Sequence, residues 1–507
     1  MNALRSRDNS WIIPAAAGLL GLALAFVIGL SNDTLALVVL LAIVGVSLLF
    51  LPTRWYVFLM VAMAVYFPLV EQIKLPIASS NIHPLDVIMV MALGAWTLRL
   101  ALKLNSIHFS ARSIALLAII LGILLIPLII GLVQHHLVTS ILRDMRVPIY
   151  YAILILVVGS SLRTPDDIPA LVIGIVIVTA PAVVYFYIAW ALGIHTTEGA
   201  ASVVLNTGRY YRYGLITSWE FIMFSWLSCV AFLVSGKVRA DQRTWLLIYT
   251  GMTLLPLLVL LVRALYLGML GGAIVIIGLS HWIRQPQRVL YFVVGAIMLG
   301  AMLLAADAAT GSGLLSAVTE RATSIIDPSA STSGSAANRE TRLQAARFIA
   351  RSTTNPFIGA GYGDRGLFSF SRSGELQALF RHSSYSWLFY RVGLVQGVFL
   401  LGVFLFIAAS AARRIRPLAD GRVRAAALAF LAAFIANLLV GFGNNTVFDF
   451  FGPFLIQPVT ALIVLLQLDQ LLPHAAVQPD AAPPVTAAAQ STPQGAVPST
   501  TARRPRA

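Results

Sequence analysis

Long apolar stretches recur along the whole chain, and short polar segments separate them. Each stretch is close to the length of about 20 residues that an α-helix needs to cross the hydrocarbon core of a bilayer. The pattern predicts an all-α polytopic membrane protein with about 14 transmembrane helices, in a range of about 12 to 14. The predicted spans cover residues 11–30, 34–52, 55–72, 85–102, 114–133, 147–161, 169–193, 215–235, 244–262, 264–282, 289–306, 384–411, 425–441 and 453–472.

The spacing of these stretches divides the chain into four predicted parts. Residues 1–306 form an N-terminal transmembrane bundle of about eleven spans, and its first stretch is a retained helix because further spans follow at once. Residues 307–383 form a large external loop that contains short helices, and residues 384–472 add about three spans. The remaining residues, 473–507, are mostly Ala, Pro, Gln, Ser and Thr without apolar periodicity, which predicts a disordered cytoplasmic tail.

Composition agrees with a membrane protein and excludes a soluble one. Hydrophobic residues make up 59% of the 507 residues and charged residues 11%, and the mean hydropathy is +0.86. A soluble domain does not have so apolar a composition. The single cysteine, Cys229, excludes an internal disulfide and a cysteine metal cluster.

The formal charge of +15 does not indicate a nucleic-acid partner, because the basic residues follow the loops between spans. Lys and Arg in short loops are enriched on the cytoplasmic side of a membrane protein, whereas long loops cross regardless of their charge. Both termini are therefore predicted to be cytoplasmic and the 307–383 loop external. The basic residues assigned inside are Arg54, Arg99, Lys103, Arg112, Arg163, Lys237, Arg239, Arg243, Arg284, Arg288, Arg413, Arg414, Arg416, Arg422 and Arg424.

A polar, arginine-rich stretch, 338–383, stands directly before the predicted span at 384–411. Its first part, Arg339 to Arg351, predicts a short helix that ends at Asn355-Pro356. Gly359, Gly361 and Gly363 then predict a turn where the backbone can approach another surface closely. Arg381-His382 stands at the mouth of the next span, where a histidine can either contact lipid headgroups or take part in chemistry.

The order of these motifs resembles the O-antigen ligase and O-antigen polymerase superfamily of bacterial inner-membrane glycan transferases. The resemblance is carried by NPFIGAGYG, then HSSYSWL, then RVGLVQG within the next span. Family members have a large external loop with a Pro-x-x-Gly-x-Gly turn that ends in His and a small polar residue. Many members have His-Asn where this chain has His382-Ser383.

The resemblance implies an activity on the periplasmic face of the inner membrane. Family members transfer a glycan from undecaprenyl pyrophosphate to an acceptor hydroxyl, and they use no cofactor. Arg212 and Arg263 match the arginines expected to bind the donor pyrophosphate, with Arg209 as a neighbour that can share this role. His382 matches the catalytic loop histidine. Arginine suits a pyrophosphate because its planar fork binds phosphate oxygens bidentately and keeps its charge.

Three further residues are candidates for a supporting role. Glu220 follows Arg212 by about two helical turns, and an ion pair with Arg212 or Arg263 explains it as well as a catalytic role does. Arg339 and Arg381 lie in the loop beside the motif residues.

Arg263 interrupts an apolar stretch, where an arginine costs several kcal/mol unless it meets an anion or water. A marker of a tight outer turn is the alternative for Arg263.

Metal and nucleotide chemistry have no support in the sequence. His135 and His136 are adjacent, so their side chains diverge on a helix, and no carboxylate follows at a ligand spacing. The chain has no Gly-x-x-x-x-Gly-Lys-Ser/Thr loop for phosphate binding. We expect neither a metal nor another cofactor.

Three functions remain open at this point. A polymerase joins lipid-linked repeat units and is favoured by the predicted span count, whereas a ligase moves finished glycan to lipid A core or another acceptor. A transporter or flippase of lipid-linked saccharide is the alternative from another class, but related halves with broken helices are not evident. The expected partners are the lipid-linked donor, the glycan or lipid A-core acceptor, membrane lipids, and, for a polymerase, a chain-length regulator and a flippase.

Overall fold

A computed structural model describes residues 51–67, 69, 84–104, 109–195, 202–205, 208–211, 213, 215, 218–235, 237–280, 307–308, 314–326, 357–364, 383–419, 421–444, 446–448 and 453–472. The chain divides into two units, Met1–Leu472 and Pro473–Ala507, and all described residues belong to the first.

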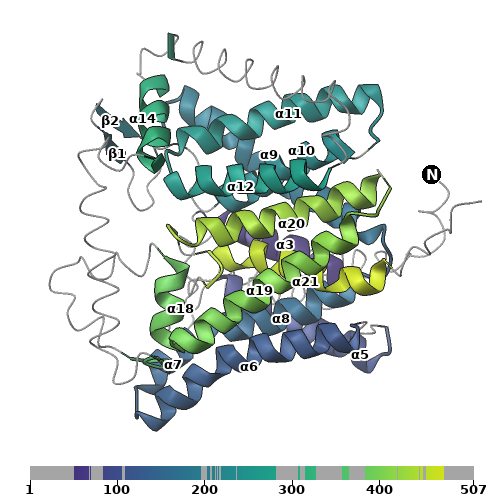
Figure 1. Cartoon of the computed structure of the whole chain (residues 1–507), viewed down its shortest axis with the longest axis vertical. Helices are drawn as coiled ribbons and strands as arrows, with labels where there is room; N and C mark the ends of the chain where they lie inside the picture. Colours follow the sequence, from purple (N-terminus) through teal and green to yellow (C-terminus); the bar gives the residue numbers. More distant parts are fainter. Residues whose placement is uncertain are drawn as a thin grey trace, which may run out of the picture. The chain divides into compact units, whose positions relative to one another are not determined.

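Helices dominate the described part, together with a two-stranded antiparallel sheet (Figure 1). The elements are α3 (Thr53–Val65), α5 (Pro84–Ala101), α6 (Ala111–Val133), α7 (Val138–Asp144), α8 (Arg146–Ser161), α9 (Asp167–Ala191), β1 (Ser202–Leu205), β2 (Gly208–Tyr211), α10 (Trp219–Ser235), α11 (Ala240–Val259), α12 (Arg263–Leu279), α14 (Leu314–Ile326), α18 (Ser384–Val392), α19 (Leu394–Ile415), α20 (Arg422–Val440), the 3₁₀ helix η7 (Pro453–Leu455) and α21 (Ile456–Leu471).

The chain is a multi-pass helical membrane protein. Within the described residues, six helical segments are long and apolar enough to cross a bilayer: α5, α6, α9, α19, α20 and the segment η7–α21. The apolar helices α3, α10 and α12 are shorter. These helices support the predicted class but not the predicted number of about 14 spans. The predicted spans at 11–30 and 289–306 lie outside the described residues, as does the span at 34–52 except for its last two residues.

Apolar side chains lie on the outside of the bundle as well as in its core. Large residues of α6 and α19, among them Ile129, Val395 and Phe399, are more than half exposed. Such surfaces are rare on soluble proteins and are typical of helices that face lipid. Most of α20 and α21 is buried, so these two helices form the centre.

Close packing holds α10, α12 and α20 together. A Cβ placed on Gly268 of α12 would lie 2.9 Å from the Ala436 carbonyl oxygen of α20 and 3.4 Å from the Met223 sulfur of α10. One turn on, a Cβ on Gly272 would meet Leu227 of α10 at 2.8 Å. Small residues let membrane helices approach this closely. The two contacts share one sequence offset, so α10 and α12 run parallel at a fixed register.

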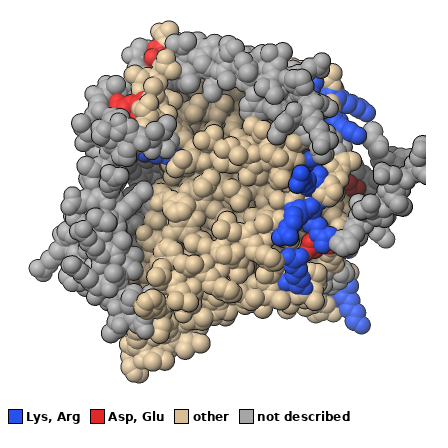
Figure 2. Space-filling view, in the orientation of Figure 1, with Lys and Arg blue, Asp and Glu red and all other residues tan. Residues whose placement is uncertain are grey.

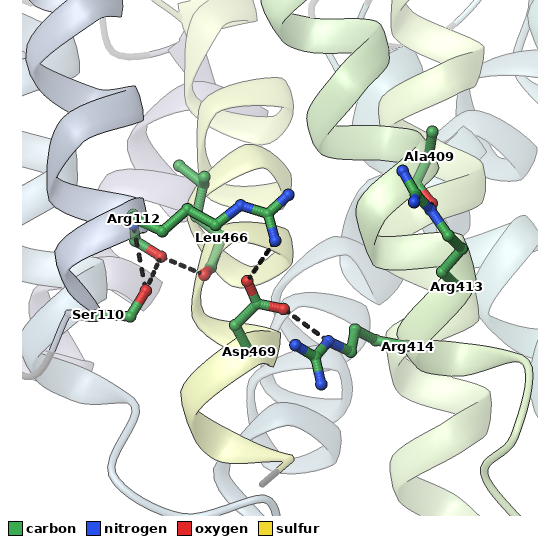
Figure 3. Close-up of polar contacts among 8 residues, drawn as sticks. Ser110, Arg112, Ala409, Arg413, Arg414, Leu466 and Asp469 are labelled. Atoms are coloured by element: carbon green, nitrogen blue, oxygen red, sulfur yellow. Dashed lines mark hydrogen bonds and ion pairs between the residues drawn. The ribbon is translucent and has the colours of Figure 1, made fainter. Parts of the chain in front are cut away.

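Helix ends that carry Lys and Arg gather at one end of the bundle, here called the basic end (Figure 2). Asp469, near the end of α21, forms ion pairs with Arg112 of α6 at 3.4 Å and with Arg414 of α19 at 2.8 Å (Figure 3). Buried Arg424 of α20 donates to the Leu279 carbonyl oxygen at the end of α12, at 2.7 Å. The basic end therefore contains the ends of α12, α19 and α21 and the starts of α6 and α20.

One local prediction was wrong, and one local feature was not predicted. The stretch predicted as one span at 384–411 breaks at Gly393, where α18 ends and α19 begins. Gly393 has φ 95° and ψ 164°, a conformation essentially reserved for glycine. The short strands β1 and β2 were not predicted; they pair in the register Ser202 to Tyr211 and leave the helical class unchanged.

Candidate functional site

The end of the bundle opposite the basic end brings together the turn Phe357–Asp364, helix α18 and the segment Gly441–Phe448; we call it the loop end. The turn contains the glycines that the sequence placed in a close approach to another surface. That prediction is confirmed: a Cβ on Gly359 would lie 2.5 Å from the Gly393 nitrogen, and one on Gly361 would lie 2.7 Å from the Gly131 nitrogen. Both glycines have positive φ, 89° and 74°. Only glycine lets this backbone pass so close to α6 and to the α18–α19 corner.

Four consecutive backbone N–H groups of the turn donate hydrogen bonds to three different helices. Ala360 and Gly361 donate to the carbonyl oxygens of Tyr390 and Arg391 on α18, at 2.8 and 3.2 Å. Tyr362 donates to the Pro127 carbonyl oxygen of α6 at 2.8 Å. Gly363 donates to the Asp144 carboxylate at the end of α7, at 2.9 Å. The turn therefore joins α18, α6 and α7.

A buried ion pair accompanies these backbone bonds. The Arg391 guanidinium lies 3.0 Å from the Asp144 carboxylate, and the two side chains are 4% and 8% exposed. Arg391 also donates to the carbonyl oxygens of Gly361 and Asp364, at 3.0 and 3.2 Å. A charge buried to this degree is tolerated when it is both paired and hydrogen-bonded, and Arg391 meets both conditions.

Two tyrosines and a histidine complete the surroundings of the turn. The Tyr362 hydroxyl donates to the Leu124 carbonyl oxygen at 2.7 Å, and burial raises the pKa of this phenol above its usual range. The Tyr390 hydroxyl donates to the Asp364 carboxylate. His136 Nδ1 lies 2.8 Å from the Tyr362 carbonyl oxygen. Because a carbonyl only accepts, Nδ1 carries the hydrogen in this contact.

The other end of α18 is attached to the segment that links α20 to α21. The Ser384 hydroxyl accepts the Thr446 and Val447 N–H groups at 2.7 and 3.2 Å. The Ser384 N–H donates to the Gly441 carbonyl oxygen at 3.0 Å. Ser383 caps the helix by accepting the Ser386 N–H at 3.3 Å. Both ends of α18 are thus fixed, which also fixes the point from which the chain leads back to His382.

Glu220 and Arg263 begin neighbouring helices at the same depth. Glu220 lies in the first turn of α10 and is fully buried, and Arg263 is the first residue of α12 and is partly buried. The fixed register of α10 and α12, in which Met223 faces Gly268, places Glu220 level with the first turn of α12. A carboxylate and a guanidinium are therefore held at one level near the loop end.

Of the remaining predicted site residues, one lies on β2 and four lie outside the described residues. Arg209 lies on β2, where it pairs with Val204 of β1. Arg212, Arg339, Arg381 and His382 lie outside the described residues. The structure does not test the roles predicted for any of these side chains, so they remain predictions.

Sequence reasoning missed three residues that the structure brings to the loop end: His136, Asp144 and Arg391. Asp144 and Arg391 are 247 positions apart, and no local pattern links them. The signal available in the sequence was the charge of Arg391 within an apolar stretch. Among the described residues, no three His, Cys, Asp or Glu side chains are grouped as metal ligands would be.

Comparisons with known proteins do not place the chain in a family. No protein-family model matches it, and no curated protein does. A chain from a solved peptidoglycan synthase complex, described as coordinating polymerization and crosslinking, is similar in structure with a TM-score of 0.41 and 15% sequence identity. The alignment covers 73% of this chain and 100% of that chain. A similarity at this level does not define a shared function.

Proposed function

We propose that this protein is a membrane glycan transferase. It moves a glycan from an undecaprenyl-pyrophosphate donor to an acceptor hydroxyl at the loop end, which faces the periplasm of a bacterial inner membrane. The observation that carries the proposal is the assembly around α18. The two motifs of the resemblance, the glycine turn and the start of the next span, are packed against each other there through backbone hydrogen bonds and the buried Arg391–Asp144 pair.

The distribution of charge supports this orientation. Lys and Arg of the described helices concentrate at the basic end (Figure 2), and short basic loops favour the cytoplasmic side. Two arginines at the loop end are bonded within the protein: Arg146 pairs with Asp86 at 2.9 Å, and Arg321 donates to the Leu261 carbonyl oxygen at 2.9 Å. The chemistry is therefore assigned to the loop end.

In the proposed reaction the acceptor oxygen attacks the anomeric carbon of the donor sugar. The new glycosidic bond forms while the bond from that carbon to the pyrophosphate oxygen breaks. Arg263, at the start of α12, is proposed to stabilise the charge on the leaving pyrophosphate with Arg212 and Arg209. The N-terminal N–H groups of α12 favour the same anion. His382 is proposed to take the proton of the acceptor hydroxyl.

Deletion and complementation in the host bacterium test the proposal. We expect loss of the gene to remove a surface glycan, the wild-type gene to restore it, and His382→Ala to fail at normal protein level. Positioned base catalysis contributes about 10²–10⁴-fold, so the loss should be nearly complete. Normal glycan output from His382→Ala, with the protein present in the membrane, would remove the histidine from the mechanism.

The lipid-linked material that accumulates separates the functional alternatives. A missing polymerase leaves single repeat units on the acceptor, and a missing ligase leaves finished polymer on the lipid carrier. A missing flippase leaves the lipid-linked glycan on the cytoplasmic side, where enzymes added outside do not reach it. That last result would overturn a transferase. The described helices do not support the span count that favoured a polymerase, so this experiment decides between polymerase and ligase.

A further inference from the structure

The ion pair Arg391–Asp144 lies at the turn, and it is more deeply buried than the pairs that Asp469 forms with Arg112 and Arg414 or that Arg146 forms with Asp86. Each partner contacts the backbone of the glycine turn as well as the other side chain. Arg391 donates to two of its carbonyl oxygens, and Asp144 accepts one of its N–H groups. The pair therefore binds backbone atoms of the turn and not its side chains.

We infer that Arg391 and Asp144 are positioning residues, which fix the glycine turn against α18 and α7 and so set the geometry of the loop-end site. The inference rests on the proposed function for its catalytic consequence. The two residues are not assigned a contact with substrate. Their effect passes through α18, whose first residue, Ser384, stands two positions after His382.

The guanidinium suits this role because of its shape. Its Nη1 serves the Gly361 and Asp364 carbonyl oxygens while Nη2 faces Asp144. Three acceptors from two segments thus meet one planar donor group. A glutamine at 391 has one amide with two hydrogens and a shorter reach, so it cannot hold all three acceptors. A lysine keeps the charge and is expected to restore part of the function.

A neutral double variant separates positioning from simple stability. Arg391→Gln alone or Asp144→Asn alone leaves one buried charge without its partner, so a lower amount of folded protein is expected from each. Arg391→Gln together with Asp144→Asn leaves no uncompensated charge, and the amount of folded protein should recover. Because the guanidinium contacts are still missing, kcat should stay about 10–100-fold low, as expected for a small displacement of a catalytic group, with KM little changed.

The matched control is the pair Arg146–Asp86, an ion pair at 2.9 Å that joins α8 to α5 at the same end of the bundle. The double variant Arg146→Gln/Asp86→Asn should keep kcat. Arg391→Lys should give a kcat between those of Arg391→Gln and the wild type. Transfer would be measured on purified protein with lipid-linked oligosaccharide extracted from the membranes of the host bacterium.

Hydrogen exchange supplies a readout that needs no substrate. In the wild type the amides of Ala360, Gly361, Tyr362 and Gly363 should exchange slowly, because all four are hydrogen-bonded. In the neutral double variant at 391 and 144 they should lose protection, and in the control they should keep it. Unchanged protection, or wild-type kcat in the neutral double variant, would overturn the inference. Absence of transfer by the wild type itself would instead count against the proposed function, while the exchange comparison would still decide whether the pair positions the turn.

Discussion

Replacing Gly393 with alanine should destabilise the protein, because two independent effects act against the new methyl group. Gly393 has φ 95° and ψ 164°, and holding an ordinary residue there costs of order 1–3 kcal/mol. The added Cβ would also lie 2.4 Å from the Phe357 carbonyl oxygen and 2.5 Å from the Ile358 carbonyl carbon. Both neighbours are backbone atoms, so relief requires the turn or the α18–α19 corner to move.

Gly402 provides the control, since it lies in α19 only nine residues further along. A Cβ there meets nothing within 4 Å, and alanine in a helix interior is favoured over glycine by about 0.5–1 kcal/mol. The two variants should therefore differ by about 1.5–4 kcal/mol from the backbone terms alone. Apparent Tm values in detergent, compared at one heating rate because membrane proteins often unfold irreversibly, would measure the difference. Equal Tm values for Gly393→Ala and Gly402→Ala would refute the role assigned to the corner.

The other predictions concern three charged side chains. Arg424→Met leaves the Leu279 and Leu418 carbonyl oxygens without their donor, at a cost of about 1–3 kcal/mol each, whereas the exposed Arg422→Met should leave Tm unchanged. Asp469→Asn should lower stability by no more than about 1 kcal/mol, less at high salt, because its ion pairs are partly exposed; a large loss would contradict that. Arg263→Lys keeps the charge but loses the fork, so glycan output should fall at constant protein level; wild-type output from both Arg263→Lys and Arg263→Ala would exclude the arginine from donor binding.

The positions of the helices could be predicted from the sequence because a bilayer demands a fixed apolar length. The predicted spans at 114–133 and 169–193 correspond to α6 and α9, with ends that differ by three residues or fewer. The break at Gly393 could not be found in this way. A single glycine in a long apolar stretch does not change its hydropathy, and its neighbours Phe357 and Ile358 are about 35 positions away in the chain.

The antiparallel pair β1–β2 was not predicted from the sequence, for a different reason. SVVLNTGRYY contains β-branched and aromatic residues on either side of Asn-Thr-Gly, which is a recognisable strand and turn signal. The segment is too short and too polar to resemble a membrane span, so hydropathy does not reveal it. Some residues of the candidate site can also be found from the local sequence. Arginines that interrupt apolar stretches, such as Arg263, are examples. The pair Arg391–Asp144 depends on a contact between distant segments and becomes visible only in the fold.

The ion pairs of Asp469 at the basic end and the Arg391–Asp144 pair at the glycine turn differ in burial, and the difference bears on which of the two places does chemistry. Asp469 joins α21 to α6 and α19 through partly exposed arginines, which hold the helices together weakly and tolerate movement. Asp144 and Arg391 are almost fully buried, and the desolvation of such a pair offsets much of its attraction. Stability alone therefore does not account for a buried pair at the glycine turn, whereas a requirement for fixed geometry does. Changes at the basic end should accordingly alter how firmly the helices associate and leave turnover intact, and changes at the turn should alter turnover even in protein that folds normally.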